Sequence, residues 1–148
     1  MTIRVLAFDE LDPRTAYALW RLRQQVFVVE QQSPYPDLDG RDLEPATRHV
    51  LATSGETDEG GLVGCLRVLD DGAHARIGRV VVAAPVRGRG LARELMDAAM
   101  VEIGDREIRL DAQTGLRDWY AGYGFEVSGP EFVEDGVAHL PMRRAQVE

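Results

Sequence analysis

A stretch rich in glycine and arginine follows a β-branched run and has the residue types of an anion-binding loop. Residues 77–92 read I-G-R-V-V-V-A-A-P-V-R-G-R-G-L-A. The pattern predicts a strand followed by a helix, whose first N–H groups lack partners within the helix and attract negative charge. The glycines allow a ligand close to the main chain, and guanidinium groups suit phosphate oxygens. A pyrophosphate could therefore bind at Arg87, Gly88, Arg89, Gly90 and Arg93.

Two well-known nucleotide loops fit this stretch poorly. A dinucleotide-binding loop has a third glycine where this chain has Arg93. A P-loop requires a lysine, and all 17 basic side chains of this sequence are arginine. An ordinary turn on a basic surface patch remains the alternative.

The cysteine and histidine residues do not predict a metal site. The single cysteine, Cys65, lies in the strand-like run G-L-V-G-C-L-R-V-L, which favours a buried structural thiol over a nucleophile. His49, His74 and His139 are far apart in the sequence, and none has a ligand partner at helical spacing. A zinc enzyme is therefore not expected.

The apolar pattern predicts one α/β domain, residues 1–148, with a mixed sheet. After the helix that follows the loop comes a further strand, and this strand–helix–strand unit predicts parallel pairing with a right-handed crossover. We expect helices over 13–31, 90–103 and 116–122. We expect seven strands, over 3–8, 48–53, 62–69, 75–83, 107–112, 125–133 and 137–143, with a polar hairpin loop over 53–61.

An acidic, proline-containing loop connects the first helix with the second strand. It covers Ser33 to Pro45 and contains Asp37, Asp39, Asp42 and Glu44. Its prolines stiffen the loop. Two interpretations remain open: the loop receives a cation, or it is a solvated loop capped by Asx turns.

Composition narrows the classes of function. The formal net charge of -8 argues against a general nucleic-acid binder and is compatible with a cationic acceptor. The sequence shows neither an apolar run of about 18 residues nor a secretory signal at its start, so we expect no membrane association and a cytoplasmic location.

Two motifs in order resemble the GNAT superfamily of acyl-CoA-dependent N-acetyltransferases. Arg87, Gly90 and Ala92 match its cofactor loop, and the run W-Y-A-G-Y-G-F over 119–125 matches its later aromatic motif. Further runs look like the ElaA-type branch, so the resemblance covers most of the chain. They are R-x-x-V-F-V-V-E-Q (23–31), P-Y-P-D-L-D-G-x-D-L (34–43), I-G-R-V-V-V (77–82) and E-D-G-x-x-H (134–139).

The resemblance implies a mixed, mostly antiparallel sheet of about seven strands flanked by helices, and transfer of an acetyl group from acetyl-CoA to an amine of a small molecule or peptide. The cofactor-binding residues it implies are Val80, Val81, Val82, Arg87, Gly88, Arg89, Gly90, Leu91, Ala92, Gln113 and Tyr120. The main chain of Val80 and Val82 would pair with the pantetheine arm, and the N–H of Val82 would polarise the thioester carbonyl. Tyr120 is the expected general acid, because a phenol stays protonated at neutral pH and can donate to a thiolate.

The general base is not assigned by the resemblance. The superfamily often has a glutamate where this chain has Gly78-Arg79, and the ElaA-type branch usually has a histidine where it has Gly115. Candidates are Glu30, His49 and His139, with His139 preferred because an imidazole changes its protonation near working pH.

Alternatives to an N-acetyltransferase also remain open. They are a non-catalytic acyl-CoA-binding or interaction module and, ranked lower, an enzyme similar to acyl-homoserine-lactone synthases. A homodimer is left open.

Overall fold

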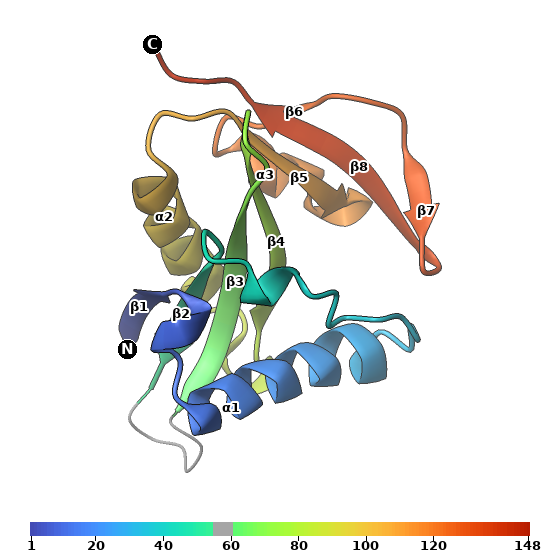
Figure 1. Ribbon diagram of the computed structural model, residues 1–148. Coiled ribbons are helices and arrows are strands. Elements are labelled where there is room, and N and C mark those ends of the chain that lie inside the picture. Colours follow the sequence, from blue (N-terminus) through green and yellow to red (C-terminus); the bar gives the residue numbers. More distant parts are fainter. Residues whose placement is uncertain (55–60) are drawn as a thin grey trace.

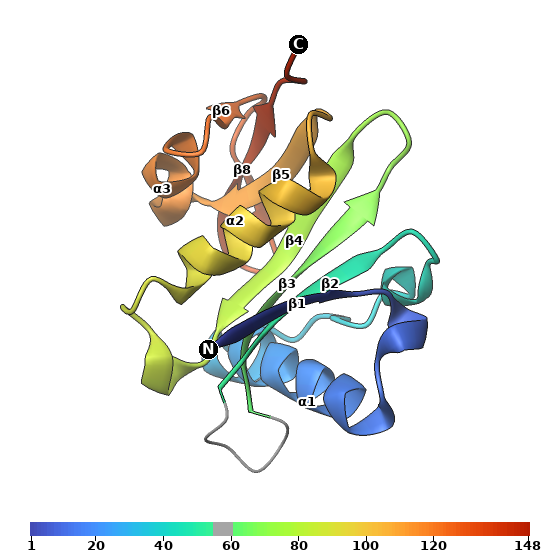
Figure 2. The same cartoon turned by 90° about the vertical axis from the view of Figure 1, so that its left-hand side faces the viewer.

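The computed structural model describes residues 1–54 and 61–148 and has one mixed β-sheet with helices on both faces (Figures 1 and 2). The strand order is β1-β2-β3-β4-β5-β8-β6, and β7 also pairs with β8. Among the described residues, only β4 and β5 pair in parallel. The polar loop expected over 53–61 falls mostly on residues 55–60, which lie outside the described residues. The strands are β1 Thr2–Leu6, β2 Arg48–Thr53, β3 Leu62–Asp70, β4 Ala75–Val82, β5 Ile108–Gln113, β6 Glu126–Val127, β7 Phe132–Glu134 and β8 Val137–Arg144.

The expected mixed, mostly antiparallel sheet is confirmed, with one more strand than predicted. The run 125–133 forms two strands, β6 and β7, which both pair with β8. Gly129 and Pro130 lie between them. Proline has no N–H to donate to a ladder, and glycine weakens a strand, so the pairing is interrupted there.

Three α-helices accompany the sheet among the described residues: α1 Pro13–Arg23, α2 Leu91–Ile103 and α3 Arg117–Ala121. Asp12 caps α1, because its Oδ1 accepts a hydrogen bond from the Thr15 N–H at 2.9 Å. The predicted helix over 13–31 is present, but its last part, Gln24–Glu30, is a π-helix. Such wider turns occur often at functional sites.

The central strands are buried on both faces. On β2, Val50 and Ala52 pack into the cluster that contains Leu95 of α2, whereas Leu51 packs with Leu19 of α1 on the other face. Figure 2 shows the two helices separated by the sheet. This alternation follows from the two-residue period of a strand. Within the described residues, no helix is long and apolar enough to cross a membrane.

Candidate active site

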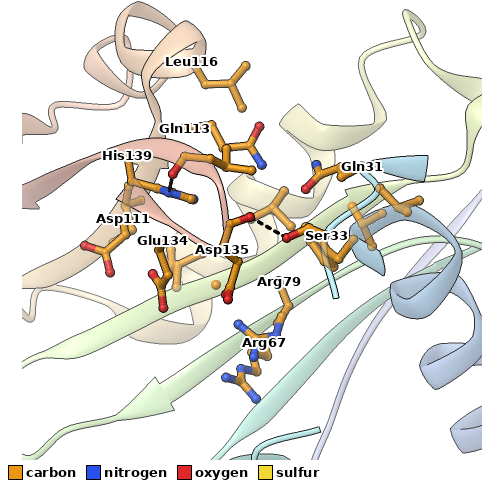
Figure 3. A pocket seen from close by; sticks show the side chains of 18 of the residues that line it. Gln31, Ser33, Arg67, Arg79, Asp111, Gln113, Leu116, Glu134, Asp135 and His139 are labelled. Carbon is orange, nitrogen blue, oxygen red and sulfur yellow. Dashed lines mark hydrogen bonds between the residues drawn. The ribbon is translucent and has the colours of Figure 1, made fainter. Parts of the chain in front are cut away.

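A cavity of about 480 Å³ lies where β4 and β5 separate. The two strands pair only at Ala75 with Ile108 and Arg76 with Arg109. Beyond these pairs, both strands line the cavity, together with the π-helical segment, α3 and the hairpin between β7 and β8 (Figure 3). The crossover α2 begins just after the diverging end of β4. Ligands in sheets of this kind bind at such an opening beyond the carboxyl ends of strands.

A β-bulge shapes the cavity side of β4. Arg67 pairs with Gly78 whereas Cys65 pairs with Val81, so β4 has one extra residue over this interval. Arg79, in the bulge, has a φ of 54°. The segment Val80–Val82 follows it and lines the cavity. Because the Val81 side chain is buried in the core facing α1, the segment can offer a ligand mainly its main chain and the flanking side chains.

The predicted anion-binding loop leads from β4 into α2. Gly88 and Gly90 have φ values of 80° and 78°, and a Cβ at either position would meet nothing within 4 Å. The first α-helical hydrogen bond runs from the Glu94 N–H to the Gly90 carbonyl oxygen. The N–H groups of Leu91 and Ala92 therefore precede the helical ladder and face an open, glycine-lined approach. This local geometry fits a phosphate group.

The predicted loop residues fall into two groups. Arg87 lines the cavity, whereas Gly88, Arg89, Gly90, Leu91 and Ala92 lie outside its wall at the start of α2. Leu91 is only 2% exposed and packs its side chain into the core. Its contribution to a ligand is consequently limited to the main chain.

Glu30 and Arg87 form an ion pair at the edge of the cavity. Arg87 Nη1 and Nη2 donate to the two carboxylate oxygens at 2.7 and 3.0 Å, and Nε donates to the Val82 carbonyl oxygen at 2.9 Å. The hydrogen bonds from Arg87 lower the pKa of Glu30. Two residues predicted for separate roles, base and cofactor binding, are thus direct partners.

Tyr120 of α3 lines the cavity with a largely buried ring. It is 6% exposed and packs edge-on against Trp119 and Phe125. Burial raises its pKa to about 12. The phenol therefore remains protonated over the whole ordinary pH range and can act as a proton donor.

His139 and Gln113 lie side by side on the cavity wall. They are paired across β8 and β5, and both line the cavity. His139 Nδ1 is 2.8 Å from the Val137 carbonyl oxygen, and its ring stacks on Phe132. Because a carbonyl oxygen only accepts, Nδ1 donates this hydrogen bond, and in the neutral ring the lone pair is then on Nε2. This tautomer is the one that a general base needs.

His49, the remaining histidine candidate, is not brought to the cavity. It is 1% exposed, and its Nε2 lies 3.2 Å from the Asp42 carbonyl oxygen. Burial lowers its pKa. The structure thus separates His49 from the other two candidate bases, Glu30 and His139, which both line the cavity.

The acidic loop is not an open cation site, because arginines of this chain pair with its carboxylates. The Asx-turn interpretation holds at Asp39, whose Oδ1 accepts a hydrogen bond from the Arg41 N–H at 3.0 Å, whereas Asp37 and Asp42 are buried. Arg23 Nε and Nη1 contact Asp37 and Asp42 at 2.9 and 2.7 Å. Arg67 donates to both carboxylate oxygens of Asp39 at 2.9 and 2.6 Å. These contacts hold the pKa of Asp39 well below its usual range.

Sequence reasoning missed these arginines although two signals were present. Arg23 follows Leu19 by four residues and precedes Val26 by three, so it lies on the apolar stripe of its helix. Arg67 interrupts an otherwise apolar strand. A charged residue at a core position requires a buried partner, and an acid-rich loop supplies one.

A hydrogen bond connects the loop to the hairpin between β7 and β8. Ser33 Oγ donates to the Asp135 carbonyl oxygen at 2.7 Å, and Figure 3 shows these residues facing one another at the cavity. Ser33 is 4% exposed. The contact joins segments far apart in sequence and completes the wall that also includes Tyr35 and Glu134.

Comparison with known proteins agrees with this arrangement. Residues 22–145 match the model of the acetyltransferase (GNAT) domain, and the chain belongs to this family of acyltransferases. Its relatives place it in the ElaA-type branch. Protein ElaA of Escherichia coli is 37% identical over 150 residues, which cover 97% of this chain and 95% of the relative. A UPF0039 protein of Mycobacterium tuberculosis is 46% identical over 145 residues, or 95% and 90% of the two chains.

A solved structure confirms the fold. The crystal structure of an acyl-CoA N-acyltransferase from Pseudomonas aeruginosa matches with a TM-score of 0.88 at 36% identity, and the match covers 98% of this chain and 100% of that one. The family resemblance expected from the two sequence motifs is therefore confirmed.

Proposed function

We propose that this protein transfers the acetyl group of acetyl-CoA to an amine of a small molecule or peptide. The observation that carries the proposal is the cavity between β4 and β5, whose wall combines the bulged segment Val80–Val82 with Tyr120 and His139. The name of the Pseudomonas aeruginosa relative, an acyl-CoA N-acyltransferase, supports the same class of reaction.

The anion-binding loop suits the cofactor. Acetyl-CoA would supply the acetyl group as an activated thioester. The open approach at Gly88 and Gly90 admits a pyrophosphate to the N–H groups at the start of α2. Because Arg87 already pairs with Glu30, the nearby Arg89 and Arg93 are the side chains we assign to the phosphates.

His139 and Tyr120 divide the proton transfers. A carbon–nitrogen bond to the amine forms while the carbon–sulfur bond breaks. Nε2 of His139 accepts a proton from the amine, and the Tyr120 hydroxyl donates its proton to the sulfur that departs. The N–H of Val82, as the family resemblance implies, stabilises the negative charge on the carbonyl oxygen during the attack.

A thiol-release screen tests the function. The full chain is incubated with acetyl-CoA and a panel of small-molecule amines and lysine peptides, and free thiol is followed beside an otherwise identical Tyr120→Phe sample. We expect release with a subset of amines, strongly reduced in the variant. Binding of coenzyme A by calorimetry without release across the panel would instead favour a non-catalytic acyl-CoA-binding module.

A further inference from the structure

Arg79 has a backbone conformation that arginine rarely adopts. Its φ of 54° lies in the left-handed region, and it forms the bulge of β4 directly before Val80–Val82. Residues other than glycine occupy this region at a cost, and they persist there where the surrounding structure holds them. Such outliers occur preferentially at active sites, and this one lines the cavity.

The side chain of Arg79 makes several contacts with the acidic loop. Its Nε lies 2.8 Å from Asp37 Oδ1 as an ion pair in which the N–H is not aimed at the oxygen. Its Nη2 donates to the Asp37 carbonyl oxygen at 3.1 Å and is 3.5 Å from Asp39 Oδ2. The guanidinium group also lies over the Tyr35 ring, 5.5 Å from its centre. Arg79 therefore contacts the carboxylate and the main-chain carbonyl of Asp37 and the ring of Tyr35, all in the same loop.

Asp37 connects these contacts of Arg79 to α1. Arg23 Nε contacts Asp37 Oδ2 at 2.9 Å, and Arg23 Nη2 donates to the same carbonyl oxygen that Arg79 uses, at 3.0 Å. The Tyr35 hydroxyl donates to Asp37 Oδ1 at 2.8 Å. Asp37 is 8% exposed, so these charged hydrogen bonds are made away from bulk water. One loop residue thus connects α1, β4 and Tyr35.

The loop in turn supplies one wall of the cavity. Ser33 and Tyr35 line it, as does the bulged strand, and Ser33 binds the β7–β8 hairpin through Asp135. Figure 3 shows Arg79 and Arg67 next to one another below this wall. A shift at Arg79 would consequently move the loop wall relative to the strand.

We propose that Arg79 is a positioning residue that, through Asp37 and Tyr35, fixes the loop wall of the cavity relative to Val80–Val82. The part of this proposal that concerns transfer to an amine rests on the proposed function. The bulge and the ion pairs stabilise each other. The left-handed conformation directs the guanidinium group toward the loop, and the contacts with the loop stabilise that conformation. The proposed phosphate site, at the loop from β4 to α2, lies outside this wall.

Arg79→Gly separates the side chain from the backbone, because glycine adopts the positive φ without cost. We expect the variant to fold and to bind coenzyme A with an unchanged Kd. Hydrogen exchange of the Asp37 amide, whose N–H donates to the Tyr35 carbonyl oxygen, should accelerate by about 10- to 100-fold, with β3 and β8 unaffected. For an amine found in the thiol-release screen, kcat/KM should fall by about 10- to 100-fold, mainly through the KM of the amine and not that of acetyl-CoA.

Two further samples complete the test. Added methylguanidinium should restore part of the lost protection and activity of Arg79→Gly, a rescue that a general loss of stability would not show. Arg106→Ala is the matched control, because it removes an exposed ion pair with Asp70 outside the cavity and should change none of these values. If Arg79→Gly does not fold, Arg79→Lys, which keeps the charge but not the forked contacts, is measured in the same way.

Several results would overturn the proposal. They are unchanged exchange of the Asp37 amide in a folded variant, absence of rescue, or equal changes in the KM values of both substrates. If no amine is acetylated, the proposed function fails, but the exchange, the rescue and the coenzyme A affinity still decide whether Arg79 positions the loop.

Discussion

Both carboxylate oxygens of Glu30 are bound by Arg87, whose third nitrogen donates to the Val82 carbonyl oxygen at the end of β4. The pair connects the π-helical end of the first helix to the end of β4 that leads into the predicted anion-binding loop. The ion pair also neutralises the charge of Arg87, the arginine of the β4–α2 loop that lines the cavity. A carboxylate with a lowered pKa that is already bound in this way is poorly suited to take a proton from an amine.

Glu30→Gln should therefore change cofactor affinity and leave the acid limb of the kcat/KM pH profile unchanged. Removing a negative charge beside a polyanion should tighten coenzyme A binding by about 2- to 5-fold at low ionic strength, less at high salt. Calorimetry at two salt concentrations measures this. Glu102→Gln, which makes the same charge change on the far part of α2, is the control. A lost acid limb would restore Glu30 as the base.

Tyr120→Phe should lower kcat by about 10²- to 10⁴-fold with little change in the Kd of coenzyme A, because the ring packing on Trp119 and Phe125 is kept. Since the pKa of Tyr120 is raised to about 12, its ionisation should not produce an alkaline limb in the usual assay range. Steady-state kinetics test both points, with Tyr17→Phe, on the exposed face of α1, as control. An unchanged kcat would remove Tyr120 from the mechanism.

His139→Gln should abolish the acid limb of the kcat/KM profile and reduce the rate by about 10²- to 10⁴-fold, since Nε2 is the atom that carries the lone pair. His74→Gln, at a histidine outside the cavity wall, serves as the matched control. The measurement is kcat/KM from acid to alkaline pH. An intact acid limb in His139→Gln would show that another group accepts the proton.

The helices and strands were predictable where their signals are local. The prediction for β2, residues 48–53, agrees with the structure in both bounds, and α2 ends at Ile103 as predicted, with Gly104 as its C-cap. Alternating apolar residues and a glycine cap are properties of short segments. The break at Gly129-Pro130 has a local signal too, because proline cannot donate to a ladder, yet the apolar pattern of 125–133 predicts a single strand.

The contacts of the cavity could not be predicted in the same way. Glu30 and Arg87 are 57 residues apart, and Ser33 and Asp135 are 102 apart. Such pairs depend on the path of the whole sheet. The acidic loop is an example: its composition indicated carboxylates, but its partners come from α1, β3 and β4.

Asp39→Asn should destabilise the protein at neutral pH by about 1 to 3 kcal/mol, because Arg67 loses charged hydrogen bonds. The folded-state pKa of Asp39 is depressed, so its contribution is present above the unfolded value of about 3.9 and is lost as pH falls toward the folded value. Denaturant unfolding at neutral and acid pH should show a smaller pH dependence in the variant. Asp9→Asn, in an exposed turn, is the control; equal pH dependence in variant and wild type would contradict the assignment.

Cys65 should not react with thiol reagents in the folded protein. It is 1% exposed, and burial raises its pKa to about 12, so almost no thiolate forms. Colorimetric labelling should detect one thiol only after denaturation, and thiol-release assays should then have no background from the enzyme. Rapid labelling of the native protein would show that the strand opens readily.

The early separation of β4 and β5 gives the sheet two free borders in its interior. At an edge strand of a sheet, unpaired main-chain N–H and C=O groups can pair with a strand of another chain. Here the borders face one another across a cavity lined by side chains of α3 and the hairpin. In the proposed function, the slender pantetheine arm of acetyl-CoA, which has amide groups, lies between them in the manner of an additional strand. The unpaired main-chain edges of β4 and β5 thus face the cavity and not the outer border of the sheet.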